Sequence, residues 1–299
     1  MQVHVKHYFM LIALGMVWGS SFPFLKIVIE TYSPIVTIAL RLTISAIAMT
    51  AFIYAIGLRI PRDLRVWRHY TVVAIVGNIV PFFLISWGEQ YINAALASVL
   101  MGLIPLATLI SAHFLTEDEK MSASKLVGIL IGGGGVIVLI GADALEGVGS
   151  HIWAQIAVVI AAFCYGISSV YVRRSKITRH NPLANAAGIL ICSSIISLPL
   201  ALLTEHPTSW EFSSRSVSAL LVLSLMCTCF AYYLLYNLLA DVGATFTSFN
   251  NYLVPVFGMI ISVILLGDTI KPTTYLALSL IFIGLLLSQR KRKKIAVNA

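Results

Sequence analysis

Residues 182–204 read PLANAAGILICSSIISLPLALLT and contain no charged side chain. As a helix, this stretch is close to the roughly 20 apolar residues that cross a bilayer. Similar runs fill most of the chain, in which 59% of the 299 residues are hydrophobic and 11% are charged. Because a soluble domain carries about 25% charged residues, the composition excludes a soluble globular protein and predicts an integral membrane protein.

Apolar runs bounded by charges, proline or glycine predict ten membrane-spanning helices. They are too long and too uninterrupted to be barrel strands, which need about ten residues of alternating polarity. The expected fold is therefore an all-α integral membrane protein. The predicted spans are 7–29, 33–56, 69–88, 94–115, 124–141, 151–172, 182–204, 216–237, 243–266 and 271–288.

The positions of lysine and arginine predict the orientation of these spans, because cytoplasmic loops are enriched in both residues. If the N-terminus is cytoplasmic, Arg215 and Lys271 lie on the outer side, and Lys26 and Arg41 fall within spans. All the others lie on the cytoplasmic side, so we expect both termini in the cytoplasm. These cytoplasmic residues are Lys6, Arg59, Arg62, Arg65, Arg68, Lys120, Lys125, Arg173, Arg174, Lys176, Arg179, Arg290, Lys291, Arg292, Lys293 and Lys294.

The two halves of the chain are weakly similar to each other at a shift of about 150 residues, and the matching positions keep their order. Since five spans is an odd number, the second copy would enter the membrane from the opposite side, as in the inverted repeats of secondary transporters. We therefore expect two five-helix repeats, 7–141 and 151–288, and a basic cytoplasmic tail, 289–299. Chance similarity between apolar segments is the alternative. The matches are Trp18–Ser21 with Tyr165–Ser168, Lys26 with Arg173, Pro34 with Pro182, Ala94, Ser98 and Pro105 with Ala244, Ser248 and Pro255, and Asp118 and Gly134 with Asp268 and Gly284.

Several of these segments resemble the EamA domain of the drug/metabolite transporter superfamily. The resemblance implies a ten-helix transporter with two EamA repeats, usually an exporter or exchanger of amino acids, other metabolites or drugs. The second half follows the pattern less strictly and has Gly267 where an acidic residue is often found, although Asp268 is adjacent. The similar segments of the first half are Trp18–Lys26, Pro34 with Arg41, Ala94–Pro105, the acidic cluster Glu117–Glu119 and the glycine run Gly132–Gly135.

The chain lacks the motifs of a membrane enzyme. It contains no His-Glu-x-x-His pair, no Gly-x-Ser-x-Gly turn and no Gly-x-x-x-x-Gly-Lys loop, so we expect no enzymatic activity, no cofactor and no metal. The glycine run Gly132–Gly135 lies inside a span, where we expect it to permit close helix packing. The basic residues serve as topology signals and not as a nucleic-acid site, with anionic-lipid contact by the tail Arg290–Lys294 as a further possibility. The oligomeric state is left open.

Polar and aromatic residues near the middle of spans are the candidates for binding a solute, because they cost free energy unless they face a partner or a wet cavity. Trp18 and Tyr165 occupy equivalent positions of the two repeats and could form opposing walls of a cavity, or could be packed in the core. For the serine and asparagine residues, the alternative is a hydrogen bond between helices. For Arg41, the alternative is a guanidinium that reaches towards the outer headgroups. The predicted substrate-binding residues are Trp18, Ser21, Arg41, Asn78, Tyr165, Asn250 and Tyr252.

No acidic residue lies at mid-span, so Glu89 at a span end is the candidate for coupling transport to protons, with Asp241 as a second candidate and passive facilitated export as the alternative. Glu89 ends the third span on the outer side, where the default expectation is a solvated loop charge. Together these features predict a secondary transporter that moves a small organic metabolite across the inner membrane of a bacterial-type cell by alternating access. Pore-like conduction, an intramembrane enzyme and a non-transporting structural membrane protein are the alternatives.

Overall fold

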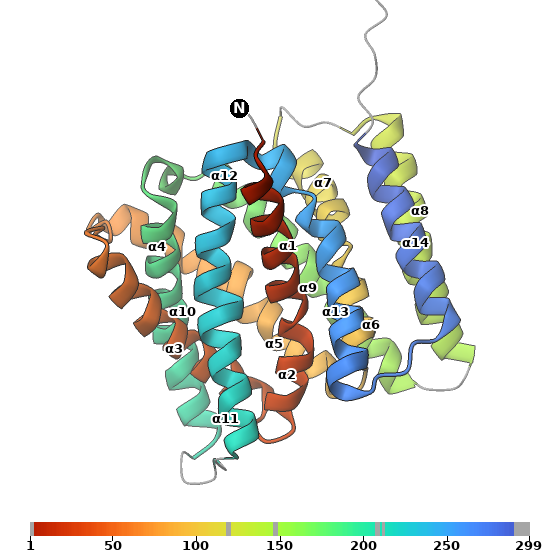
Figure 1. Cartoon of the computed structure of the whole chain (residues 1–299), viewed down its shortest axis with the longest axis horizontal. Helices are drawn as coiled ribbons and strands as arrows, with labels where there is room; N and C mark the ends of the chain where they lie inside the picture. The colour runs from red at the N-terminus through yellow and green to blue at the C-terminus, as the bar shows by residue number, and fades with distance from the viewer. Residues whose placement is uncertain (1–2, 118–120, 146–148, 207–209, 211–212, 290–299) are drawn as a thin grey trace, which may run out of the picture.

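The computed structural model describes residues 3–117, 121–145, 149–206, 210 and 213–289. Every regular element in these ranges is a helix, as the sequence predicted, and the basic tail from residue 290 onwards lies outside them (Figure 1). The elements are α1 (Val5–Gly19), α2 (Ser21–Ile29), α3 (Pro34–Ala55), α4 (Leu64–Ala74), a π-helix (Ile75–Ile79), α5 (Val80–Gly88), α6 (Ala94–Met101), α7 (Ile104–Leu115), α8 (Ala123–Leu145), α9 (Gly149–Arg174), a 3-10 helix (Lys176–Arg179), α10 (Pro182–Thr204), α11 (Ser214–Leu221), a second π-helix (Val222–Phe230), α12 (Ala231–Thr247), α13 (Asn250–Leu266) and α14 (Pro272–Ser288).

Eight helical segments of the described chain are long and apolar enough to cross a membrane, by length and composition. Two further apolar helices, α13 and α14, have 17 residues each, which at about 1.5 Å per residue is close to the thickness of the hydrocarbon core. The eight long segments are Val5–Ile29, Pro34–Ala55, Leu64–Gly88, Ala94–Leu115, Ala123–Gly141, His151–Arg174, Pro182–Thr204 and Ser214–Ala244.

Several predicted spans are interrupted helices. Span 7–29 breaks at Ser20, and span 94–115 breaks at Gly102–Leu103. The expected start of the ninth span at Gly243 coincides with a kink: α12 is interrupted at Gly243, whose φ is +82° and ψ is +174°, and after Thr247 the chain continues into α13 at Asn250. A left-handed residue is tolerated there because glycine has no Cβ.

Proline and a side-chain cap fix the start of two long helices. Pro34 and Pro182 are the first residues of α3 and α10, where a missing N–H and a fixed φ favour helix initiation. The preceding residues, Ser33 and Asn181, accept hydrogen bonds from the first turn of each helix. The same device therefore starts both helices of this pair.

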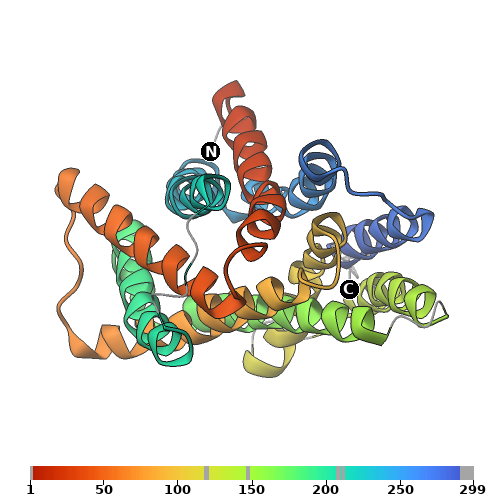
Figure 2. The same ribbon diagram turned by 90° about the horizontal axis from the view of Figure 1, so that it is seen from below.

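Helices of the first half pack mainly on helices of the second half. α3 lies along α10, α8 along α14, α1 along α13, and α7 along α9. Figure 2 shows the α3–α10 and α8–α14 pairs at opposite edges of the molecule. The chain end of α14 lies at the same end of the bundle as the start of α1 (Figure 1).

Glycine allows two of these crossings to be close. A Cβ on Gly19 of α1 would lie 2.7 Å from the backbone nitrogen of Gly258 in α13, and a Cβ on Gly166 of α9 would lie 2.8 Å from the backbone of Ala107 and Thr108 in α7. Side chains at either position would force the backbones apart.

The predicted packing role of the glycine run holds for only part of it. A Cβ on Gly132 would collide with the Leu106 side chain, and one on Gly135 would lie 2.9 Å from the carbonyl oxygen of Ala277 in α14. Gly133 and Gly134 face open space, with no atom within 4 Å of an added Cβ. The run therefore serves close packing at its two ends.

Candidate functional site

Arg41 lies inside the bundle. Its side chain comes from the middle of α3, only 7% of the residue is exposed, and the guanidinium carbon lies 4.1 Å from the centre of the Phe82 ring. Nε and Nη2 each donate to Thr228 Oγ1 at 3.4 Å, the long limit of a hydrogen bond. The guanidinium therefore lies within the bundle and not at its surface. None of the ion pairs between described residues involves Arg41.

Tyrosines and a cysteine surround this guanidinium. Tyr165 of α9 and Tyr232 of α12 are close enough to interact with it electrostatically, as is Cys227. The Tyr165 ring centre lies 6.4 Å from that of Phe82, and the Tyr232 ring lies 6.0 Å from that of Tyr236. The site thus joins α3 and α5 of the first half to α9 and α12 of the second, and combines one cation with aromatic and hydroxyl groups.

The second π-helix places Thr228 beside Arg41. Its wide turns let the Thr228 hydroxyl donate to the carbonyl oxygen of Leu223, five residues earlier, at 2.9 Å. The Thr228 hydroxyl oxygen keeps its lone pairs and accepts from the Arg41 guanidinium. π-Helical turns are rare and occur frequently at functional sites.

The break between α1 and α2 borders the same site. Ser20, which separates the two helices, has its hydroxyl 3.7 Å from the sulfur of Cys227 and donates to the carbonyl oxygen of Val17 at 2.9 Å. Ser21 donates instead to the carbonyl of Trp18, at 2.6 Å, so its hydroxyl is used within its own turn.

Trp18 packs in the interface between α1 and α12. It contacts the apolar cluster that contains Leu11, Leu14 and Leu234. Trp18 is thus packed against apolar side chains, whereas Tyr165 of the same predicted pair lies by Arg41. The structure gives the two aromatic residues separate surroundings.

The three remaining candidates are buried polar groups. Asn78, in the first π-helix, is 3% exposed and its amide nitrogen donates to Ser193 Oγ at 3.1 Å, which is a hydrogen bond between helices. Asn250 begins α13, and its Oδ1 has no hydrogen-bond partner among the described residues. The same is true of the Tyr252 hydroxyl, while its ring packs edge-on against Phe282.

Glu89 corrects the sequence-based expectation most strongly, because it is fully buried and is not a solvated loop charge. It directly follows α5, and neither carboxylate oxygen has a hydrogen-bond partner in the described part of the chain. Burial raises the pKa of Glu89 well above its usual value, Lys26 and Arg41 oppose that shift, and Asp268 adds to it. Asp241, the alternative, is partly exposed and pairs with Lys6 at 3.2 Å and His7 at 3.3 Å.

Lys26 lies next to Glu89 but bonds to the main chain. Its ammonium donates to the carbonyl oxygen of Glu89, and to that of Ile92 at 3.0 Å. These carbonyls follow the end of α5, where no helical N–H is available to them. Lys26 therefore caps α5 while leaving the carboxylate of Glu89 unpaired.

Sequence reasoning missed Phe82, Thr228 and Cys227 as neighbours of Arg41. Phe82 follows Pro81 in a run of aromatic and aliphatic residues, and nothing in the sequence distinguishes Thr228 from other threonines within spans. Lys26 was placed within a span without a role, although a lysine so close to a helix end indicates a carbonyl or carboxylate partner.

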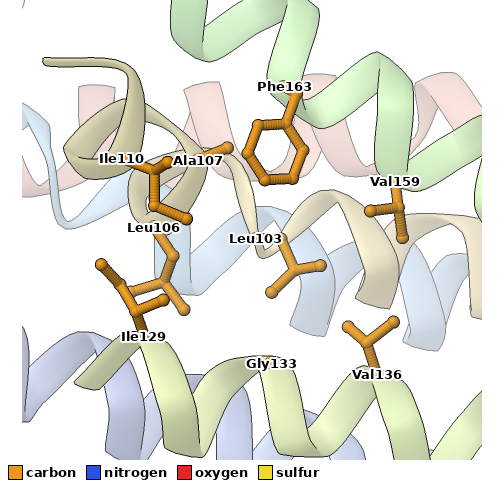
Figure 3. Close-up of a pocket in the computed structure, with 9 residues that line it drawn as sticks. All are labelled: Leu103, Leu106, Ala107, Ile110, Ile129, Gly133, Val136, Val159 and Phe163. Carbon is orange, nitrogen blue, oxygen red and sulfur yellow. The ribbon is translucent and has the colours of Figure 1, made fainter. Parts of the chain in front are cut away.

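An apolar cavity of about 170 Å³ lies between α7, α8 and α9. Figure 3 shows Phe163 and Val159 projecting into it from one side, and Ile129 and Val136 from α8 on the other. Its lining contains no charged or hydrogen-bonding side chain. Such a cavity can hold hydrocarbon, but it cannot recognise a polar solute.

Comparison with known proteins gives two matches to one family. The description "EamA-like transporter family" fits residues 5–141 and again residues 152–289. The family resemblance inferred from the sequence is thereby confirmed.

Curated relatives cover nearly the whole chain. The uncharacterized transporter YoaV of Bacillus subtilis is 23% identical over 93% of this chain and 94% of its own length. An uncharacterized transporter of Archaeoglobus fulgidus is 28% identical (92% and 95%), and the uncharacterized inner membrane transporter YedA of Escherichia coli is 24% identical (93% and 88%). One crystal structure, 19% identical, superimposes with a TM-score of 0.64 over 95% of this chain and 97% of its own, and thus shares the fold.

Proposed function

This chain belongs to the EamA-like transporter family, and from that membership we propose that it is a secondary transporter that moves a small organic solute with an acidic group across the inner membrane by alternating access. The protein is a multi-pass membrane protein. In this proposal, Arg41 lies in the solute path and binds the acidic group of the solute.

The proposed architecture is ten spans in two inverted five-helix repeats, 7–141 and 151–288. The reciprocal helix crossings support it. Gly19 of the first span meets Phe257–Gly258 in the ninth, and Gly166 of the sixth meets Ala107–Thr108 in the fourth. Gly166 follows Gly19 by 147 residues, and Phe257–Gly258 follow Ala107–Thr108 by 150. Two crossings related by the same shifts as the sequence matches are the expected result of a two-fold axis between repeats.

The proposed orientation has both termini in the cytoplasm. The bias of lysine and arginine supports it, and so does the position of the start of α1 and the end of α14 at one end of the bundle (Figure 1). Inner-membrane localisation follows YedA, which is named an inner membrane transporter.

The observation that carries the proposed solute class is the incomplete pairing of Arg41. A buried guanidinium has five N–H donors, yet the described contacts are one hydroxyl at 3.4 Å and one aromatic face. Burying a charge without a good partner is costly. A carboxylate or phosphate on the solute would accept two parallel hydrogen bonds from the planar guanidinium. Tyr165 and Tyr232 would then contact the remainder of the solute.

Alternating access requires contacts between the halves that can form and break at each end. At the N-terminal end, Asp241 of α12 pairs with Lys6 and His7. At the opposite end, Glu30 pairs with Arg215 at 3.4 Å. The Lys6–Asp241 and Glu30–Arg215 pairs lie at the surface, where water screens an ion pair, which suits contacts that must open during a transport cycle.

Counterflow in proteoliposomes tests the proposal. Vesicles loaded with unlabelled amino acids, and separately with other small carboxylates, are diluted into the labelled compound. We expect saturable uptake that requires the unlabelled solute inside. Uptake that rises linearly with concentration would indicate a pore. Chemical conversion of the solute in detergent would indicate an enzyme.

A further inference from the structure

Glu89 is a carboxylic acid in surroundings that do not stabilise a carboxylate. The residue is fully buried, and neither Oε1 nor Oε2 has a hydrogen-bond partner among the described residues. An ionised carboxylate that loses its hydration needs hydrogen bonds or a close cation, and without them it takes up a proton. A protonated Glu89 would avoid the free-energy cost of burying a charge in this conformation.

The charged groups around Glu89 come from three directions. Lys26 of α2 directs its ammonium at the carbonyl oxygens of Glu89 and Ile92. Arg41 of α3 and Asp268, in the segment after α13, act with opposite signs at longer range.

α9 adds no charge where it meets the end of α5. A Cβ on Gly88, the neighbour of Glu89, would lie 2.9 Å from Val158 and 3.1 Å from the carbonyl oxygen of Ala154. The ammonium of Lys26 in α2 is bonded to backbone carbonyl oxygens. None of the ion pairs between described residues involves the Glu89 carboxylate.

We propose that Glu89 is the site at which this transporter binds and releases the proton that drives its solute. The carboxyl group takes a proton from water at that end of the bundle while the end is open, holds it when the end is closed, as in this structure, and passes it to water in the solute path when the opposite end opens. The inference rests on the proposed function, because a proton site drives transport only in a carrier.

The same end of the bundle contains the contacts that would have to open. Asp268 Oδ2 accepts a hydrogen bond from the backbone N–H of Ala95 at 3.1 Å, and the Asn93 amide donates to the carbonyl oxygen of Thr269 at 3.2 Å. Both contacts join the first half to the second beside Glu89. Their separation would admit water to the carboxyl group and let it exchange its proton with the solution on that side.

The geometry favours a proton over a sodium ion. A metal cation would need several oxygen ligands, and the carbonyl oxygens of Glu89 and Ile92 are already bonded to the Lys26 ammonium. A proton needs only the carboxylate. Buried acidic residues serve as proton relays in other transporters.

Infrared spectroscopy of the purified protein in lipid nanodiscs tests the protonation without any solute. Between about pH 5 and pH 9, which brackets ordinary and raised carboxyl pKa values, we expect the C=O stretch of a protonated carboxyl group to titrate. Glu89→Gln should lose this band, and Glu30→Gln, which changes a half-exposed acid at the same end, should keep it. Glu89→Asp should retain a band at a shifted frequency, which serves as the test if Glu89→Gln does not fold. An ionised Glu89 throughout this range, or an unchanged band in Glu89→Gln, would overturn the assignment.

Transport in proteoliposomes tests the coupling. We expect an imposed pH gradient to drive accumulation of whichever labelled amino acid shows counterflow, and Glu89→Gln to lose this accumulation while its exchange no longer varies with pH. Wild-type counterflow that responds to a sodium gradient, or to neither gradient, refutes the coupling and leaves the proposed function standing. Absence of counterflow for every solute refutes the proposed function, whereas the infrared result still decides whether Glu89 holds the proton.

Discussion

Replacement of Arg41 by alanine should abolish solute binding and leave the fold intact. A bidentate contact with an acidic solute consists of two hydrogen bonds to a charged group, each contributing about 1.5–3 kcal/mol. Losing both would cost about 3–6 kcal/mol, or roughly a hundredfold to ten-thousandfold in affinity. Arg41→Lys keeps the charge but offers a single point of contact, so it should recover only part of this loss.

The protein should tolerate both substitutions because Arg41 contributes little to folding. Its long contacts with Thr228 and its cation–π contact with Phe82 are worth about 2 kcal/mol or more at a desolvated site, and they are offset by the cost of burying the charge. Gel filtration in detergent and counterflow of the labelled solute measure the two effects. Arg59→Ala, which removes an exposed arginine between α3 and α4, is the matched control and should transport normally.

Two outcomes would refute this reasoning. Wild-type transport by Arg41→Ala would remove Arg41 from the solute path. Aggregation of both Arg41 variants, with normal behaviour of Arg59→Ala, would assign the guanidinium a structural role.

Three further predictions concern topology and packing. A reporter that is active only in the cytoplasm should be active after Ala299 and silent near Glu146, and the reverse would overturn the proposed orientation and the inverted repeat. Gly19→Val and Gly166→Val should each lower the melting temperature in detergent by a similar amount, because both push a side chain against the backbone of the crossing helix at a cost of about 1–3 kcal/mol or more; a large effect of only one would argue against equivalent crossings. Gly133→Ala should raise the melting temperature, since an added Cβ meets no atom within 4 Å at the edge of the apolar cavity and alanine gains up to about 1 kcal/mol of helix propensity; a lower melting temperature would show that this space is needed.

The sequence predicted the helices well because the thickness of the bilayer sets the length of an apolar helix that crosses it. It did not predict their breaks. Ser20 and Gly102 resemble the other small residues of their spans, and at both breaks the backbone N–H bonds to a carbonyl of the preceding turn, Ser20 to Met16 and Gly102 to Val99. The π-helices at Ile75–Ile79 and Val222–Phe230 likewise depend on tertiary packing and leave no periodic signal.

The sequence predicted those site residues whose exposure to lipid would cost free energy. Arg41 could be placed in the interior because a lipid-facing arginine is unfavourable. Its neighbours Phe82 and Thr228 come from other helices, at separations along the chain that no local pattern reveals. Glu89 was expected in solvent since it follows a span, and its burial depends on Lys26 satisfying the carbonyls of the same turn.

The placement of Arg41 on one repeat only has a kinetic consequence. At the 148-residue shift that pairs Pro34 with Pro182, the counterpart of Arg41 is Ile189, an aliphatic side chain that packs on the cluster containing Tyr70. A carrier with two equal halves would offer the same half-saturation concentration to both faces of the membrane, whereas a single cation to one side of the proposed two-fold axis would make the two values differ. Without an ion gradient, the maximal rates in the two directions must differ in the same ratio as the two half-saturation concentrations, because no net accumulation of the solute is then possible. The asymmetry would then affect net transport only far from equilibrium. Accumulation of the solute would require coupling to the proton proposed for Glu89.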